Sequence, residues 1–381
     1  MKKIILSLII LITIGITGCG SSTSNSEEKE ITLANLEEKT GVYFEKGKDE
    51  PFTGIASEYY SNGNIKIKKT YKNGKQEGES IFGYDNGNIK IKGTYKDGLP
   101  EGERIYYNKD GSIQTKEIYE NGIFSKFDGT PRELKYDSMF SPVEIKNDIY
   151  FARGEDIPFN GLIKFYYDDE VNIKQITNFK YGKENGEILI YDINGNIVYR
   201  ENQINGKTEG EVLSYYNGGK ILRYKTNYKN GLKDGEYIEY FEDGSIDYLQ
   251  NYKEDKLNGP YISYFKNSEI ICTTGTYLND NKDGEWIEYY SDKTIKIIGS
   301  YIFGLKDGEW ISYFSNGRVE SKGIYINNNK DGNWIYYYSH GVKKNIENYK
   351  NGIKDGEWVW YSLFGEVTKK ETYQDGKFIT E

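Results

Sequence analysis

Few residues in this chain have the side chains from which active sites and metal sites are built. Its 381 residues include one His, His340, and two Cys, Cys19 and Cys272. Because a lone His has neither a second metal ligand nor a triad partner, His340, which takes the place of an Asn in sister segments, is interpreted as a turn residue. Cys272 aligns with Lys296 on the polar side of a predicted strand, so we interpret it as an outward-facing thiol. No catalytic residue is predicted.

Pairs of carboxylates recur around a glycine, as in Asp283-Gly284-Glu285. A calcium loop needs closely spaced oxygen ligands from several positions, and here only two side chains flank one glycine. Turn formation explains the pattern without a metal. We therefore predict a non-enzymatic protein with no metal, no cofactor and no small-molecule substrate.

The first residues have the order of a secretory signal. Two Lys follow Met1, residues 4–17 are almost wholly apolar, and the run ends at Ile16-Thr17-Gly18-Cys19. An apolar stretch of about 14 residues is short for a bilayer core, which needs roughly 20. An ordinary signal peptide with an unrelated Cys is the alternative interpretation.

The tetrapeptide at 16–19 resembles the bacterial lipobox. This resemblance implies that residues 1–18 are removed as a lipoprotein signal peptide and that Cys19 receives acyl chains such as palmitate. Residues 19–40 then form the lipidated Cys and its tether, since residues 20–30 are polar and rich in Ser and Glu. The predicted location is exported and lipid-anchored to the cell membrane. Gly20, in place of an Asp, implies the outer membrane in an organism with two membranes.

The charge of the chain argues against nucleic acid as a partner. The formal net charge is -9 at pH 7, and Lys and Glu are interspersed along the sequence. A nucleic-acid binder needs a basic face that neutralises phosphates, which this sequence does not supply. Lys and Arg also form no polybasic block for anionic lipid, so attachment to a membrane would depend on the acyl chains.

A repeat of 24 or 25 residues organises the chain, with one longer step between its third and fourth units. Each unit is framed by a glycine, at Gly54, Gly78, Gly102, Gly161, Gly186, Gly210, Gly235, Gly259, Gly284, Gly308, Gly332 and Gly356. Apolar and polar residues alternate in both halves of a unit, and Asn-Gly or Asp-Gly pairs separate the halves in many units. This alternation is the period of a strand, and such pairs favour tight turns. Each unit is therefore predicted to be a β-hairpin.

Aromatic residues recur in phase with the glycines. A Tyr stands five residues after the framing glycine in eleven of the twelve units, and a second Tyr closes most units. Glycines two places before the closing Tyr, such as Gly275 and Gly299, leave room for a neighbouring ring on the backbone. We predict an aromatic ladder along the sheet, with Tyr240, Tyr264, Tyr289, Tyr313, Tyr337 and Tyr361 among its members. The predicted fold is all-β, an elongated antiparallel sheet of stacked 24-residue β-hairpins.

The repeats fall into two arrays, predicted at 41–122 and 149–381. Both open with similar residues, Tyr43 to Gly54 and Tyr150 to Gly161, where a proline is expected to block strand addition at the starting edge. Residues 123–148 break the period and are predicted to be a cap and connector that includes at most one helical turn.

The units resemble the bacterial MORN-variant repeat over residues 43–378. The resemblance implies a repeat scaffold without a catalytic site that binds other proteins, or lipid as proposed for eukaryotic relatives. Many bacterial members carry an antitoxin label. The function predicted is noncovalent binding of a protein partner at the cell envelope. The alternatives are an antitoxin or immunity protein that neutralises a toxin, and a glycan-binding module that uses exposed aromatic rings.

Overall fold

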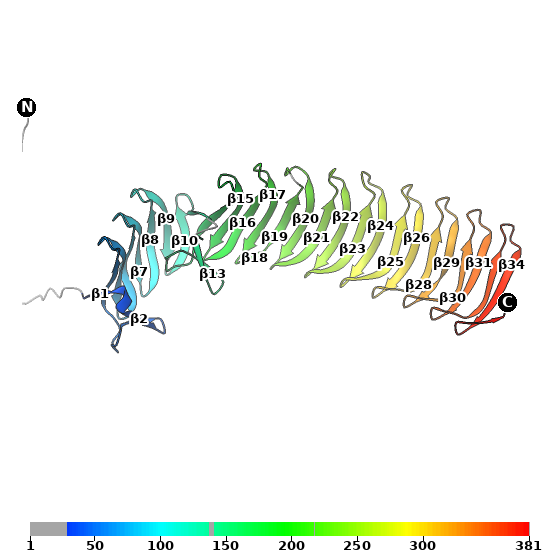
Figure 1. Cartoon of the computed structure of the whole chain (residues 1–381), viewed down its shortest axis with the longest axis horizontal. Helices are drawn as coiled ribbons and strands as arrows, with labels where there is room; N and C mark the ends of the chain where they lie inside the picture. The colour runs from blue at the N-terminus through cyan, green and yellow to red at the C-terminus, as the bar shows by residue number, and fades with distance from the viewer. Residues whose placement is uncertain (1–28, 137–140, 217, 381) are drawn as a thin grey trace, which may run out of the picture. The chain divides into compact units, whose positions relative to one another are not determined.

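The computed structural model describes residues 29–136, 141–216 and 218–380. The chain divides into two compact units, residues 1–130 and 131–381, and each is described by itself. The predicted all-β fold of stacked hairpins is confirmed, because each unit is built on one long sheet whose strands follow chain order (Figure 1). Within the described part of the chain, no helix is long and apolar enough to cross a membrane.

Unit 1 contains an eight-stranded sheet in the order β1-β4-β5-β6-β7-β8-β9-β10. Its strands are β1 (Glu30–Thr32), β4 (Gly54–Tyr59), β5 (Ile65–Lys72), β6 (Lys75–Gly83), β7 (Ile89–Lys96), β8 (Leu99–Tyr107), β9 (Ile113–Glu120) and β10 (Ile123–Asp128). A short 3-10 helix, η1 (Leu33–Asn35), and a separate hairpin of β2 (Leu36–Lys39) and β3 (Val42–Glu45) complete the unit.

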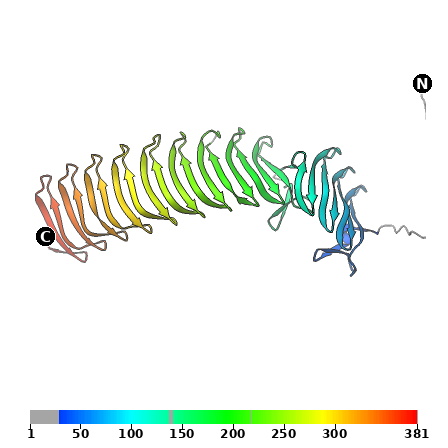
Figure 2. The same cartoon turned by 180° about the vertical axis from the view of Figure 1, so that it is seen from behind.

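Unit 2 contains a 23-stranded sheet, which runs in chain order from β11 and β14 to β35. Its first strands are β11 (Glu133–Lys135), β14 (Gly161–Tyr166), β15 (Ile173–Lys180), β16 (Lys183–Tyr191), β17 (Ile197–Ile204), β18 (Lys207–Thr208), β19 (Gly210–Tyr215), β20 (Leu222–Lys229), β21 (Leu232–Tyr240), β22 (Ile246–Lys253) and β23 (Lys256–Tyr264). The others are β24 (Ile271–Leu278), β25 (Asn281–Tyr289), β26 (Ile295–Ile302), β27 (Leu305–Lys306), β28 (Gly308–Tyr313), β29 (Val319–Ile326), β30 (Asn329–Tyr337), β31 (Lys343–Lys350), β32 (Ile353–Lys354), β33 (Gly356–Tyr361), β34 (Val367–Gln374) and β35 (Lys377–Thr380). Figure 2 shows the strands from behind.

The starting edge of each array differs from the prediction. β1 pairs with β4 and β11 pairs with β14 in parallel, so a short parallel strand covers each edge of these otherwise antiparallel sheets. Pro51 and Pro158 form isolated bridges to Phe44 and Phe151 instead of ending the sheet. Each array therefore begins with a cap made of one parallel strand and one hairpin.

The segments between and before the arrays are more structured than predicted. The connector predicted at 123–148 is divided: β10 ends the sheet of unit 1, whereas β11 and β12 (Val143–Lys146) belong to unit 2, where β12 pairs with β13 (Ile149–Ala152). Its described part contains strands and turns, and residues 137–140 lie outside the described residues. Likewise, residues 30–39 of the predicted tether form β1, η1 and β2.

Apolar cores lie at the capped ends. In unit 2, Val143 and Ala152 of the cap hairpin pack with Phe159, Ile163 and Phe179 at the first repeat. In unit 1, Phe52, Ala56 and Tyr71 form the equivalent cluster. Beyond the caps, most side chains are only partly buried, as expected of stacked hairpins that contact their nearest neighbours.

Candidate interaction surfaces

The framing glycines are required by their backbone conformation. All twelve have positive φ values, from 65° at Gly332 to 145° at Gly54, a region that side chains rarely adopt. In β25, Gly284 follows Lys282 and Asp283 and precedes Trp286, and it pairs with Tyr301 of β26. The glycine therefore sets the bend that places the aromatic residue of each repeat on one face of the sheet.

That face, here called the aromatic face, carries a continuous ladder of rings in unit 2. Tyr224, Tyr237, Tyr248, Tyr261 and Trp286 stack one on the next with centroid distances of 5.6–6.0 Å. Beyond Trp286 the contacts become edge-on, and tryptophans alternate with the closing tyrosines of the repeats. Such pairs add to the area that the rings bury.

Each of three tryptophans lies flat on a glycine of the preceding strand, which confirms the space predicted there. A Cβ added to Gly299 would lie 2.2 Å from the ring of Trp310. The indole Nε1 of Trp310 donates to the carbonyl of Ser300 at 3.2 Å. On the other side, the Lys306 ammonium lies 4.1 Å from a Trp310 ring centroid, a cation–π distance. The same arrangement recurs around Trp286 and Trp334.

This packing buries the tryptophan rings of the aromatic face, whereas the tyrosine rings of the ladder are half-buried. The four tryptophans at 286, 310, 334 and 358 are only 5–8% exposed. Burial also lowers the pKa of the covering Lys306 and Lys330 ammonium groups, because a low-dielectric environment disfavours their charge. The flat surfaces of these rings are thus used within the fold itself.

The ladder runs through residues other than the six tyrosines predicted for it. Those six lie at the ends of strands, and three of them accept hydrogen bonds through their backbone carbonyls from a Tyr in the preceding repeat. The hydroxyls of Tyr216, Tyr290 and Tyr338 donate to the carbonyls of Tyr240, Tyr313 and Tyr361 at 2.7, 2.7 and 3.1 Å. The other three predicted tyrosines, Tyr264, Tyr289 and Tyr337, receive no such bond, because the preceding repeat has a Phe in place of the donor Tyr. These phenylalanines are Phe241, Phe265 and Phe314.

His340 occupies the turn position that the sequence suggested, whereas Cys272, predicted to face outward, is half-buried. His340 lies in a hairpin turn, and its Nε2 is 2.9 Å from the carbonyl oxygen of Leu363 in the next repeat. Because a carbonyl only accepts, this nitrogen must be the donor. Asn316 makes the same contact one repeat earlier, from its Nδ2 to the carbonyl of Ser339 at 2.9 Å. Cys272 is a half-buried free thiol in β24.

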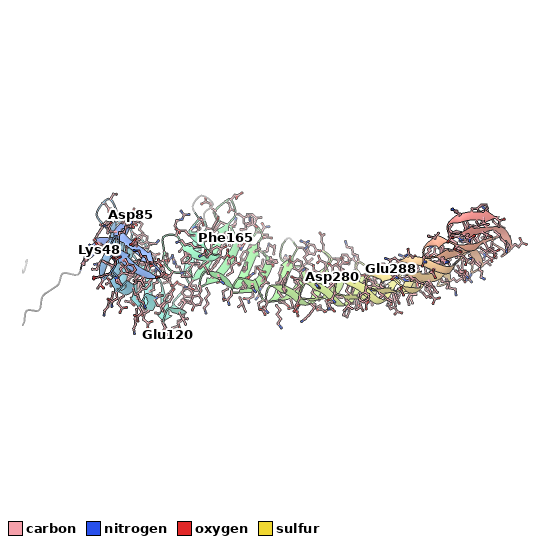
Figure 3. The ribbon with its side chains drawn as sticks, turned by 90° about the horizontal axis from the view of Figure 1, so that it is seen from below. Lys48, Asp85, Glu120, Phe165, Asp280 and Glu288 are labelled. Carbon is pink, nitrogen blue, oxygen red and sulfur yellow. The ribbon has the colours of Figure 1, made fainter. Side chains whose placement is uncertain are left out.

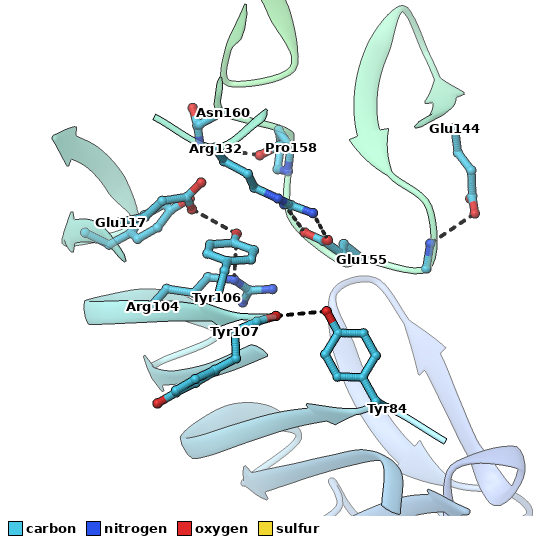
Figure 4. A network of polar contacts seen from close by, with 12 residues as sticks. Tyr84, Arg104, Tyr106, Tyr107, Glu117, Arg132, Glu144, Glu155, Pro158 and Asn160 are labelled. Carbon is cyan, nitrogen blue, oxygen red and sulfur yellow. Dashed lines mark hydrogen bonds and ion pairs between the residues drawn. The ribbon is translucent and has the colours of Figure 1, made fainter. Parts of the chain in front are cut away.

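In unit 1, charged residues lie where unit 2 has the rings of its aromatic face. Arg104 stands two residues after its framing glycine, where other repeats have Trp, and both Arg104 and Glu117 are fully buried. The hydroxyls of Tyr106 and Tyr119 donate to Glu117 Oε2 at 3.0 and 2.7 Å, and Figure 4 shows the Tyr106 contact. Arg104 Nη1 donates to the Tyr95 hydroxyl at 2.9 Å. These hydrogen bonds to tyrosine hydroxyls link the buried Arg104 and Glu117 side chains across β7, β8 and β9.

The cap of unit 2 holds a buried ion pair. Arg132 and Glu155 form two parallel hydrogen bonds, one of them 2.8 Å long, and their side chains are only 5% and 2% exposed (Figure 4). Arg132 also supplies the carbonyl that accepts from the amide of Leu162. The pair therefore fixes the segment before β11 against β14 and is best explained as structural.

The opposite face of unit 2, here called the aliphatic face, carries a row that sequence reasoning missed. Directly paired residues of neighbouring strands share a face, and the pairing continues through Ile287, Ile298 and Ile311 of β25, β26 and β28. The same register extends from strand to strand on both sides of these three. Its members on β21 to β33 are Ile238, Leu249, Ile262, Thr274, Ile287, Ile298, Ile311, Lys322, Ile335, Ile346 and Val359.

Most members of this row are half-buried. A signal for it existed in the sequence, because the residue three places after a framing glycine is apolar in most repeats. Figure 3 shows the side chains of unit 2, with Glu288 of β25 and Asp280 of the turn before it labelled.

Carboxylates lie beside the aliphatic row. Glu285 pairs with Ser300, and Asp283 pairs with Thr276, which places both acids of the Asp-Gly-Glu frame on the aliphatic face. Near the C-terminal end of the sheet such an acid is neutralised by a cation, as by Lys370 beside Glu357 at 2.8 Å. Among the described residues, no measured ion pair joins Glu285 to a cation. Among them, too, no group of three or more His, Cys, Asp or Glu is placed to hold a metal ion.

Comparison with known proteins identifies the repeat. The family model described as MORN repeat variant matches seven segments of the chain, at residues 52–73, 76–97, 233–254, 282–302, 306–327, 330–351 and 354–375. The chain is a MORN-variant repeat protein. Each matched segment spans the two strands of one hairpin and its framing glycine, so the MORN-variant period coincides with the structural one. No curated protein matches this MORN-variant chain.

Solved structures give only a distant likeness. The Photorhabdus luminescens Tc holotoxin pore with the mutation TccC3-D651A is 10% identical over 89% of this chain and 21% of that chain, with a TM-score of 0.16. The TcdB2-TccC3 structure is 11% identical over 86% of this chain and 24% of that chain, with a TM-score of 0.15. The MORN-variant chain thus spans less than a quarter of the length of these proteins. TM-scores this low support no conclusion about fold or function.

Proposed function

We propose that this MORN-variant protein is a membrane-anchored, non-catalytic scaffold of the cell envelope that binds a protein partner. One observation carries the proposal: the two faces of the unit 2 sheet differ in how they use their apolar side chains. The aromatic face buries its tryptophan rings against its own repeats, whereas the aliphatic face leaves a mostly apolar row, interrupted by Thr274 and Lys322, half-exposed. Contiguous exposed apolar surface is typical of sites that bind another protein.

The membrane anchor rests on the sequence, because residues 1–28 lie outside the described residues. The apolar run 4–17 and the lipobox-like Ile16-Thr17-Gly18-Cys19 support export and acylation of Cys19. Mass spectrometry of the mature protein should find an acylated N-terminal Cys19. Cys19→Ala should leave the protein unprocessed or release it from membranes, and an unmodified mature N-terminus elsewhere would refute the anchor.

Partner binding is tested by placing a photo-crosslinking amino acid on each face of unit 2 in intact cells. Ile298 on the aliphatic face is the test position. Ser312, which pairs with Ile297 on the aromatic face, is the matched control. We expect a discrete protein adduct from position 298 and none from position 312. Lack of an adduct at 298 and at other aliphatic-face positions would refute protein binding by this surface.

The two alternatives give different results in the same experiment. An antitoxin would yield an adduct whose gene is toxic when the scaffold is deleted, and a second deletion of that gene would restore viability. A glycan-binding module would need open aromatic rings. The 5–8% exposure of the four tryptophans leaves little ring surface for sugar stacking.

A further inference from the structure

Five exposed apolar side chains lie on the aliphatic face between β24 and β29, and a sixth, Phe303, lies in the turn between β26 and β27. We call this group the Phe303 patch. It adjoins the aliphatic row, since Ile302 lies on the same strand as Ile298 and on the same face. Its members are Leu278 (40% exposed), Ile302 (50%), Phe303 (72%), Leu305 (39%), Ile324 (49%) and Ile326 (43%).

The fold does not require apolar residues at these positions, as the other repeats show. Leu278, Ile302 and Ile326 each follow the closing Tyr of a repeat. The same position holds a charged or polar residue in eight other repeats and an apolar one, Ile204, in only one. The eight are Lys72, Lys96, Glu120, Lys180, Lys229, Lys253, Lys350 and Gln374. Three consecutive repeats thus share an apolar residue where the scaffold accepts Lys.

Phe303 is the most unusual member of the patch. It lies in a turn between repeats with φ of 49°, a left-handed conformation that is unfavourable for a bulky residue. The equivalent turn position holds Asn at 73, 121, 205, 230, 279, 327 and 351, Asp at 97 and 375, Glu at 254, and an aromatic residue elsewhere only at Tyr181, the first such turn of unit 2. Asn tolerates this backbone conformation and exposure to water. Phe303 therefore lowers stability in two ways, through its unfavourable φ and through its exposed ring, and it contributes to no core. An outlier of this kind points to a role in binding.

Acidic residues surround the patch. Ile324 pairs with Glu309 of β28 on one side and with Asp331 of β30 on the other, so two carboxylates flank it directly. Glu285 lies on the same face two strands earlier. The lysines at 282, 306 and 330 cover tryptophans on the opposite face. Lys322 is the cation that the aliphatic row brings to this region.

We infer that the Phe303 patch docks a basic, apolar segment of a protein partner, one in which aliphatic side chains alternate with Lys or Arg. This inference rests on the proposed function and adds the chemistry of the partner. Aliphatic side chains of the segment would cover the six patch residues, and its cations would meet Glu285, Glu309 and Asp331. A second copy of this chain fits less well, since a two-fold contact would bring like carboxylates together. Anionic lipid is repelled by the same charge.

The test uses the full mature chain and variants that copy residues from other repeats, so that each should fold. Phe303→Asn restores the usual turn residue, and a second variant combines Leu278→Lys, Ile302→Lys and Ile326→Lys. Ile204→Lys is the matched control, because Ile204 occupies the same repeat position outside the patch and is 48% exposed. Equal denaturation midpoints or higher ones will show that the variants are folded.

Binding is measured with three short peptides of alternating sequence: Ile with Lys, Ile with Glu, and Ser with Lys. We expect the Ile–Lys peptide to bind the wild type and the Ile204→Lys control equally, and to bind both patch variants at least tenfold more weakly. Glu309→Lys should weaken the same peptide, and the other two peptides should bind poorly. Equal binding to the patch variants and the control, or a preference for the Ile–Glu peptide, would overturn the inference. So would patch-dependent dimerisation or binding to anionic vesicles.

A further measurement distinguishes failure of this inference from failure of the proposed function. The protein captured by crosslinking at position 298 is purified and bound to the same variants. If the patch variants bind it as tightly as the wild type does, the scaffold function stands and the Phe303 patch is not its docking site. If no protein is captured at position 298 or at the other aliphatic-face positions, the proposed binding of a protein partner by this surface is refuted, whatever the peptides do.

Discussion

Replacing Gly299 by Ala tests the central contact of the aromatic face. The φ of Gly299 is not in the left-handed region, so Ala is compatible with the backbone and any cost comes from its methyl group. The added Cβ would lie 2.2 Å from the Trp310 ring, whereas ordinary contacts begin at 3.4 Å. Because the nearby atoms belong to the rigid indole, the ring must move by about 1 Å or leave its place.

The cost is bounded by two known kinds of substitution. Overpacking a well-packed site costs about 1–3 kcal/mol, and complete loss of a buried Trp costs about 3–5 kcal/mol. Displacement of Trp310 would also lengthen its 3.2 Å hydrogen bond to Ser300 and disturb the Lys306 contact. Ala recovers about 0.5–1 kcal/mol because it is less flexible than Gly in the unfolded chain. We expect a net loss of about 2–3 kcal/mol.

Guanidinium denaturation followed by tryptophan fluorescence and far-ultraviolet circular dichroism measures this loss. The matched control is Gly93→Ala, whose Cβ would lie 3.3 Å from Arg104 Cγ, so that a shift of a few tenths of an ångström relieves the contact and the cost should be under about 1 kcal/mol. In a Trp310→Leu background, Gly299→Ala should cost little, because the clash is gone. A loss below about 0.5 kcal/mol in the wild type, or an equal loss in both backgrounds, would refute the reasoning.

Three further outcomes follow from contacts between repeats. Phe314→Tyr should raise the free energy of unfolding by about 0.5–1 kcal/mol, because its new hydroxyl can donate to the carbonyl of Tyr337 as Tyr290 does one repeat earlier; an unchanged midpoint would contradict this. His340→Asn should stay within about 0.5 kcal/mol of wild type, whereas His340→Ala should lose about 1 kcal/mol with the bond to Leu363, both measured by denaturation. Burial raises the pKa of many tyrosines such as Tyr237, so the folded chain keeps protons that the unfolded chain loses near pH 10; stability should be intact below that pH and fall above it, with tyrosine ionisation and unfolding coinciding in an absorbance titration.

The repeat, the hairpins and the glycine spaces could be predicted because each leaves a periodic signal. The space above Gly299 can be recognised within a single strand, because the glycine lies at a fixed distance from a closing Tyr. No knowledge of the rest of the fold is needed. The parallel strands β1 and β11 gave no such signal, since three residues are too few to show an alternation. Their pairing with β4 and β14 depends on the path of the chain between the paired strands. The spacing of residues within one strand does not specify that path.

The identity of the ladder was harder to predict than its existence. Two rows of aromatic residues have the same 24-residue period, one two residues and the other five residues after the framing glycine. Period alone does not distinguish them. The structure does, because Trp310 faces Gly299 whereas Tyr313 lies at a strand end, where its carbonyl receives a hydroxyl. The direct neighbour of a ring across the sheet decides whether it packs.

The two faces of unit 2 differ in how well they tolerate substitutions. This difference explains how a docking surface could arise on a repeat scaffold. Contacts between neighbouring repeats on the aromatic face depend on a ring, a glycine and a lysine together, so a change at any one of them disturbs the other two. On the aliphatic face, a repeat accepts Lys, Gln or Ile at one position without loss of the stack, as Lys253, Gln374 and Ile302 show. Residues there can change one repeat at a time while the sheet persists. An apolar patch confined to three consecutive repeats, with Phe303 in a turn that favours Asn, is therefore better explained by binding than by folding.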